Sequence, residues 1–295
     1  MEKFSTWRDK GTGISPFMPV DAPPSSIASK YLAQPVLYVF KFPILIITLA
    51  LYYALIPFPA VANFIVTKLY GFRRIETTVD GLKRSKVAEI QAAKPKVNDI
   101  VVVNYVAPIN GLILASIAQC SWRSIVILIP AANGEYYSYS IWDVFTRAMD
   151  EISTPNPSAQ PITDLTALKG KLVFIFPEGT PSNNRSILPF VTSKTNKLKV
   201  NNVFTFKTLS LKISPLHFTT PLPLTSKFAY VYSLLTNLHN KSVISVKIFE
   251  HGQSNELDFN LSKRSFETNQ LNSVGDYLDI QMKEKFYAEY IKVKR

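Results

Sequence analysis

The sequence lacks most of the residues that cross-link a protein or hold a metal. It has one cysteine, Cys120, so no intrachain disulfide can form, which is typical of a protein from a reducing compartment. Its three histidines, His217, His239 and His251, are scattered along the chain without the spacing of a metal site. We therefore predict no bound metal and no cofactor.

Acidic residues are also scarce, which makes the chain strongly basic. It carries 21 aspartates and glutamates against 33 lysines and arginines, a net charge of +12. Such an excess favours anionic partners, namely phospholipid headgroups, a CoA phosphate or nucleic acid. Nucleic acid fits least well, because the sequence contains neither a basic motif interleaved with aromatic residues nor a zinc-finger spacing. Hydrophobic residues make up 47% of the chain, which excludes general disorder.

The N-terminus has no basic start followed by an apolar core, so we expect no cleaved signal peptide. Residues 1–30 form a polar, turn-rich segment, and residues 31–70 follow as a predicted membrane-inserted segment. Within it, residues 42–67 contain no charged side chain over 26 positions, and about 20 apolar residues suffice to span a bilayer. Pro57 and Pro59 divide this run, since a proline inside a helix removes a hydrogen bond and kinks or ends the helix.

Basic residues flank the apolar run on both sides, so charge does not decide an orientation. A hairpin or shallow insertion with both ends on the cytoplasmic side fits the central prolines best. A single transmembrane helix is the second interpretation, and a buried helix of a soluble core is the third.

Residues 71–295 have the pattern of one α/β domain. A short strand is predicted at 76–81, and apolar runs predict strands at 100–103, 124–129 and 172–176. Alternation predicts half-exposed strands at 209–213 and around Val246 and Ile248. Helices are predicted from Pro108 to Gln119, at 140–151, at 226–238 and from Val274 onward, with a loop at 154–161. We expect a mixed, mostly parallel sheet flanked by helices. The last helix is expected to dock on the domain itself.

Two of the predicted buried strands end in polar turns. Val103 is followed by Asn104 and Tyr105, and Phe176 is followed by Pro177 and a run of polar residues from Glu178 to Arg185. Ligands in open parallel sheets bind at the carboxyl ends of the strands, so both turns are expected to face one crevice. Composition alone favours an ordinary polar loop between a strand and a helix.

The stretch Phe-Pro-Glu-Gly-Thr at 176–180, followed by Leu-Pro-Phe at 188–190, resembles the signature of the PlsC-type glycerolipid acyltransferases. The opening residues Trp-Arg-Asp at 7–9, Gly-Thr-Gly at 11–13 and Pro-Phe at 16–17 are similar to the start of fungal members of that family. The resemblance implies acyl transfer from acyl-CoA, a co-substrate, to a lysophospholipid such as lysophosphatidic acid. It also implies an endoplasmic reticulum or lipid-droplet membrane, and it suggests that Trp7 and Phe17 pack on the domain or the membrane.

The resemblance breaks at the usual catalytic pair. Asn104 and Pro108 match the frame around the family's His-x4-Asp motif, but Tyr105 stands at the histidine position and Asn110 at the aspartate position. A general base works best with a pKa near the operating pH, and a phenol has a pKa of about 10. Tyr105 and Asn110 are thus degenerate catalytic positions, which puts the family's usual mechanism in question.

The substrate-binding loop is better preserved. Glu178, Gly179 and Thr180 match the family, whereas Pro181 replaces the arginine that usually follows. Arg185 or Lys194 is then the candidate for the phosphate contact. Two functions remain open: an acyl-CoA-dependent lysophosphatidic acid acyltransferase, and a catalytically inactive PlsC-like protein that binds lipid and acts in membrane trafficking.

Overall fold

The computed structural model describes residues 2–55, 57–150, 160–191, 198–200, 203–220, 225–239, 241–254 and 256–294. Most of the predicted loop at 154–161 lies outside these residues, as does Lys194.

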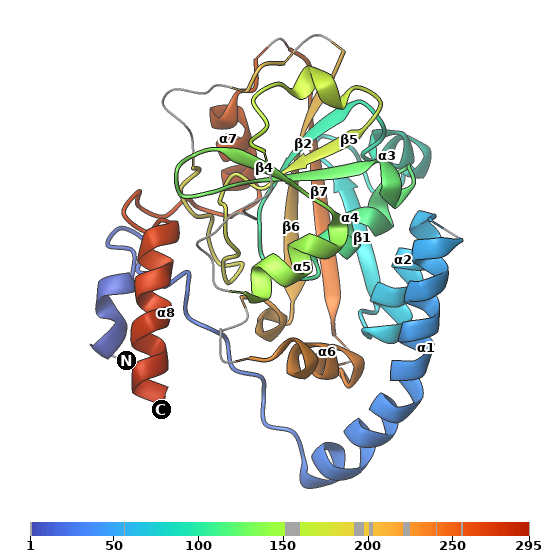
Figure 1. Cartoon of the computed structure of the whole chain (residues 1–295), viewed down its shortest axis with the longest axis vertical. Helices are drawn as coiled ribbons and strands as arrows, with labels where there is room; N and C mark the ends of the chain where they lie inside the picture. Colours follow the sequence, from blue (N-terminus) through green and yellow to red (C-terminus); the bar gives the residue numbers. More distant parts are fainter. Residues whose placement is uncertain are drawn as a thin grey trace.

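A seven-stranded mixed sheet forms the centre of the domain (Figure 1). Its strands are β1 (Arg74–Val79), β2 (Asp99–Val103), β3 (Ile125–Pro130), β4 (Tyr136–Tyr139), β5 (Leu172–Ile175), β6 (Thr205–Ser214) and β7 (Val243–Gln253). The spatial order is β1-β7-β6-β2-β5-β3-β4, and only the β3–β4 and β6–β7 pairs are antiparallel. The predicted mostly parallel sheet is confirmed.

The central strands are covered on both faces, which explains their unbroken apolar runs. Val101 and Val103 of β2 belong to a core that includes the helices on one face, whereas Val102 packs with Phe266 of α7 (Phe259–Thr268) on the other. The helices of the first face are α2 (Pro59–Phe64), α4 (Asn110–Ile117), α5 (Ile141–Met149) and α6 (Lys227–Leu235). A short helix α3 (Val87–Ala93) contacts β1.

Three predictions differ from the structure in detail. The strand at 209–213 is not half-exposed, because α7 contacts β6 and the Asn269 side chain donates a hydrogen bond to buried Ser210. The helix α4 begins at Asn110 rather than at Pro108, and the last helix, α8 (Ile280–Lys294), begins after the predicted start at Val274. A local sequence pattern predicts the presence of a helix or strand better than it predicts the residue at which the element begins.

The apolar segment near the N-terminus folds into two helices. Residues 29–54, which end in α1 (Gln34–Ala54), are long and apolar enough to cross a membrane. After the break around the two prolines, α2 returns beside α1 (Figure 1), and the Lys41 ammonium donates to the carbonyl of Leu69 at 3.0 Å. The end of α1 is tied to the α/β domain, because Trp122 donates to the carbonyl of Tyr52 and Arg123 to that of Tyr53.

The two ends of the chain pack against each other. The N-terminal segment runs beside α8 (Figure 1), and Trp7 and Phe17 are buried with ring centroids 5.5 and 6.0 Å from that of Phe286. The Asp9 carboxylate accepts a hydrogen bond from the backbone of Gly275 at 2.8 Å. Both aromatic residues thus pack on the protein itself, and α8 docks on the domain as predicted.

Candidate functional site

The loops after β2 and β5 meet at the carboxyl edge of the sheet, as the sequence predicts. The buried carboxylate of Glu178 joins them: it accepts the backbone N–H of Tyr105 at 2.7 Å and that of Leu188 at 2.8 Å. The backbone of Ser182 also donates to the Tyr105 carbonyl at 2.9 Å. Glu178 and Tyr105 therefore share one site, held together mainly by backbone groups.

Tyr105 lies inside this junction with no exposed surface. Its ring stacks on Phe176 with centroids 4.6 Å apart, and its hydroxyl donates to the carbonyl of Val144 in α5 at 3.0 Å. Burial raises the pKa of the Tyr105 hydroxyl far above its usual range. In this arrangement the phenol packs two layers together and keeps its proton, so it has little tendency to form the phenolate that a general base would require.

Asn110 shapes the turn between β2 and α4. Its side-chain oxygen accepts the N–H of Ala107, and its amide donates to the carbonyl of Asn104, both at 3.1 Å. The Asn104 amide in turn exchanges two hydrogen bonds with the backbone of Leu211 in β6. An amide suits this position because it needs both a donor and an acceptor, whereas a carboxylate only accepts.

The C-terminal helix covers the Glu178 loop. Gly179 has φ +68°, and a Cβ there would overlap the Ile280 side chain at the start of α8. One turn later, the ammonium of Lys283 donates to the Thr180 hydroxyl at 2.8 Å and to the carbonyl of Pro181. Lys283 is fully buried although it belongs to a helix with many exposed charges.

Burial shifts the pKa values of two groups in the site in opposite directions. It raises the pKa of Glu178 to about 8, although the two backbone donors and nearby Lys283 oppose the shift. It lowers the pKa of Lys283 to about 7, which the charge of Glu178 opposes. The hydrogen bonds fit the charged forms of both groups, since Glu178 only accepts and Lys283 only donates.

The remaining predicted site residues differ in whether they are buried at this junction. Thr180 is buried and bound to Lys283, Arg185 is exposed while its neighbours in the loop are buried, and Lys194 lies outside the described residues. The N-terminal segment closes another side of the loop, because the Asn183 amide donates to the carbonyls of Ser15 and Met18.

Lys283 is a site residue that the sequence pattern did not predict. Only its position in the helix pointed to burial. It lies three residues before Phe286 and seven before Tyr290, on the same side of the amphipathic helix as these apolar residues. A lysine beside such a stripe is ordinarily a surface residue, so nothing local distinguished it.

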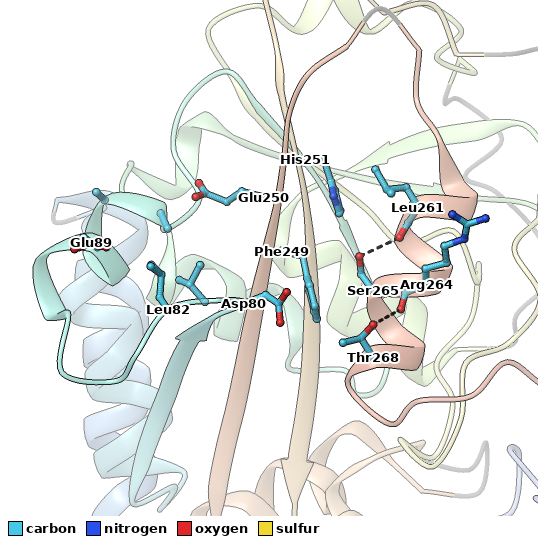
Figure 2. Close-up of a pocket in the computed structure, with 13 residues that line it drawn as sticks. Asp80, Leu82, Glu89, Phe249, Glu250, His251, Leu261, Arg264, Ser265 and Thr268 are labelled. Atoms are coloured by element: carbon cyan, nitrogen blue, oxygen red, sulfur yellow. Dashed lines mark hydrogen bonds between the residues drawn. The ribbon is translucent and has the colours of Figure 1, made fainter.

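A separate cavity of about 650 Å³ opens at the other end of the sheet, beside β7 (Figure 2). It is lined on one side by Asp80 and Glu89 and on the other by Arg264 of α7, with His251 between them. Its carboxylates are engaged: Asp80 pairs with Lys247 at 2.8 Å, Glu89 with Lys86 at 2.9 Å and Glu250 with Lys207 at 3.5 Å. None of the predicted site residues that the structure describes lines this cavity.

Comparison with known proteins finds two fungal relatives that cover most of the chain. A Saccharomyces cerevisiae protein named lysophosphatidic acid:oleoyl-CoA acyltransferase 1 is 26% identical over 314 aligned positions, covering 100% of this chain and 99% of its own length. A Schizosaccharomyces pombe protein provisionally named lysophosphatidic acid:oleoyl-CoA acyltransferase is 27% identical over 244 positions, covering 78% of this chain and 79% of its own. The chain is a homologue of these fungal proteins. No family model and no solved structure matches it.

Proposed function

We propose that the protein transfers an acyl chain from acyl-CoA to the free hydroxyl of lysophosphatidic acid, yielding phosphatidic acid for glycerolipid and triacylglycerol synthesis. The carrying observation is the Glu178-Gly179-Thr180 loop, bound through Glu178 to the turn at Tyr105 on the carboxyl edge of the sheet. The names of the two fungal homologues support the same reaction. The net charge of +12 suits the phosphates of both substrates.

A second function is favoured by the state of the degenerate catalytic pair. The Tyr105 hydroxyl is bound to Val144 and the Asn110 side chain holds the turn, so both residues have structural contacts. The alternative is a protein that binds lysophospholipid without acylating it and acts in membrane trafficking.

One assay separates the two functions. Purified full-length protein is incubated with labelled oleoyl-CoA and a panel of lysophospholipids, and labelled phospholipid and free CoA are both measured. We expect labelled phosphatidic acid from lysophosphatidic acid. Lipid binding without any labelled product would instead support the non-catalytic alternative.

We propose that residues 31–70 attach the protein to the cytoplasmic face of the endoplasmic reticulum and of lipid droplets. The contact of Trp7 with Phe286 supports an insertion that enters and leaves on one side, since one crossing would separate these residues. The bonds from Trp122 and Arg123 to the end of α1 hold the turn of the hairpin near the domain. The outer side of α1, with the exposed apolar side chains of Phe40 and Ile47, is therefore the part that meets lipid.

The attachment is tested in two ways. Tags at both termini should show the same protease sensitivity in sealed microsomes, and one protected tag would exclude a hairpin. With Cys120 replaced by alanine, a fluorophore on a cysteine at Phe40 or Ile47 should be quenched by lipid-borne quenchers. A fluorophore on a cysteine at Ser121, beside the turn, should be quenched less.

A further inference from the structure

Lys283 is a buried cation without a bonded anion among the described residues. Its side chain has no exposed surface, and its ammonium donates to two neutral acceptors, the Thr180 hydroxyl and the Pro181 carbonyl. The ammonium also lies over the Tyr287 ring, 5.2 Å from its centroid. An ammonium has three N–H donors, so beside this ring contact one remains for a hydrogen-bond acceptor. Burying this cation carries a large desolvation cost, and the nearby but unbonded carboxylate of Glu178 offsets only part of it. An anion in direct contact with the ammonium would offset more.

The loop that Lys283 touches also holds an unused donor. Ser186 is 1% exposed, and its hydroxyl has no hydrogen-bond partner among the described residues. The oxygens of Glu178 are engaged by the backbone of Tyr105 and Leu188 rather than by the ammonium. The side-chain oxygen of Asn184 is likewise unpartnered, but it is an acceptor and takes no part in binding an anion. A buried cation and an unpartnered hydroxyl are what an anion site requires.

Lys283 supplies a positive charge next to position 181, where the loop itself has no basic side chain. Family members that the chain resembles carry an arginine after the Glu-Gly-Thr residues, and this chain has Pro181, which has no side-chain donor. Helix α8, more than a hundred positions later in the sequence, brings an ammonium to the carbonyl of that same proline.

We propose that Lys283 of the C-terminal helix takes the place of that arginine and binds a substrate phosphate at the loop 178–186. The inference rests on the proposed function and adds a residue to it. The ligand chemistry is a phosphomonoester, which lysophosphatidic acid carries on its glycerol and CoA carries on its ribose.

Thr180, Ser186 and Lys283 are each at most 1% exposed, so a phosphate reaches them only when α8 shifts. Ile280 packs against Gly179, and the N-terminal segment holds α8 through Trp7 and through the bond from Gly275 to Asp9. These contacts involve side chains and one backbone bond rather than a continuous strand or helix ladder. Binding should therefore change amide hydrogen exchange in residues 2–18 and 276–294 together.

The test measures binding by the full-length protein and does not need turnover. Thermal unfolding is followed with oleoyl-lysophosphatidic acid, with monooleoylglycerol, which lacks the phosphate, and with CoA. We expect Lys283→Met to weaken binding of one phosphomonoester at least tenfold and Lys283→Arg to retain most of it, with monooleoylglycerol unaffected by either. Lys285→Met removes the same charge from an exposed position of the same helix, and this variant should bind the three ligands like wild type.

The ligand that loses affinity identifies the phosphate, either that of lysophosphatidic acid or that of CoA. Wild-type affinity of Lys283→Met for both would overturn the proposal, whether or not the protein acylates lipid. Binding that depends on Lys283 in a protein without turnover would sustain the anion site and reject the proposed catalysis. Should Lys283→Met fail to fold, unchanged hydrogen exchange of wild-type 2–18 and 276–294 with either ligand would overturn it equally.

Discussion

Replacing Glu178 with alanine should destabilise the protein as well as alter its site. The carboxylate is the acceptor for two buried backbone donors, the N–H groups of Tyr105 at 2.7 Å and Leu188 at 2.8 Å. Each buried donor left without a partner costs about 1–3 kcal/mol, so the two together give about 2–6 kcal/mol. Removing a buried charge relieves part of its own desolvation cost, which places the expected loss of unfolding free energy at about 2–4 kcal/mol.

The assay is urea unfolding of the purified protein in detergent, with activity measured on the fraction that remains folded. Glu178→Gln keeps one acceptor oxygen and should lose about half as much unfolding free energy, because the NH₂ of its amide cannot accept from the second backbone N–H. Glu289→Ala, an exposed glutamate on α8, serves as the matched control and should change the unfolding free energy by less than about 0.5 kcal/mol. If Glu178→Ala is as stable as this control, the carboxylate does not hold the two loops together.

Three further outcomes follow from the same site. Gly179→Ala should lower the unfolding free energy by about 1–3 kcal/mol, because the residue has a left-handed backbone and a Cβ there overlaps Ile280. The loss should be smaller in an Ile280→Ala background, and additive losses in a double-mutant cycle would rule out the overlap. Tyr105→Phe removes only the hydrogen bond to Val144, so it should lower the unfolding free energy in urea by about 0.5–1.5 kcal/mol. It should change the acylation rate only a few-fold, and a hundredfold fall in that rate would show that the hydroxyl takes part in the chemistry. Burial lowers the pKa of Lys283 from 10.5 to about 7, so between these values the unfolded chain binds a proton that the folded chain does not, and the stability contributed by this group rises with pH. Lys283→Met should therefore flatten the rise in unfolding free energy between pH 7 and 9.5, and an equal rise in both proteins would contradict the lowered pKa of Lys283.

Local patterns in the sequence determined the strands and the crevice. The apolar runs at 100–103 and 172–176 predict strands buried on both faces, and parallel strands place the turns that follow them at one edge. That is why Glu178 and the Tyr105 turn could be assigned to one site before the structure. The same reasoning identified the apolar segment and its break at Pro57 and Pro59, which need only composition and backbone chemistry.

Only the tertiary structure decided what each site residue touches. The periodicity of the last helix shows that one side is apolar, but Lys283 is buried because α8 docks on a loop a hundred positions away, with Trp7 packed behind it. Tyr105 stands at a catalytic position of the resembled motif, yet its surroundings are Phe176 and the carbonyl of Val144. Sequence spacing fixes which face of an element a residue occupies, whereas burial, pKa and function depend on which distant element comes to cover that face.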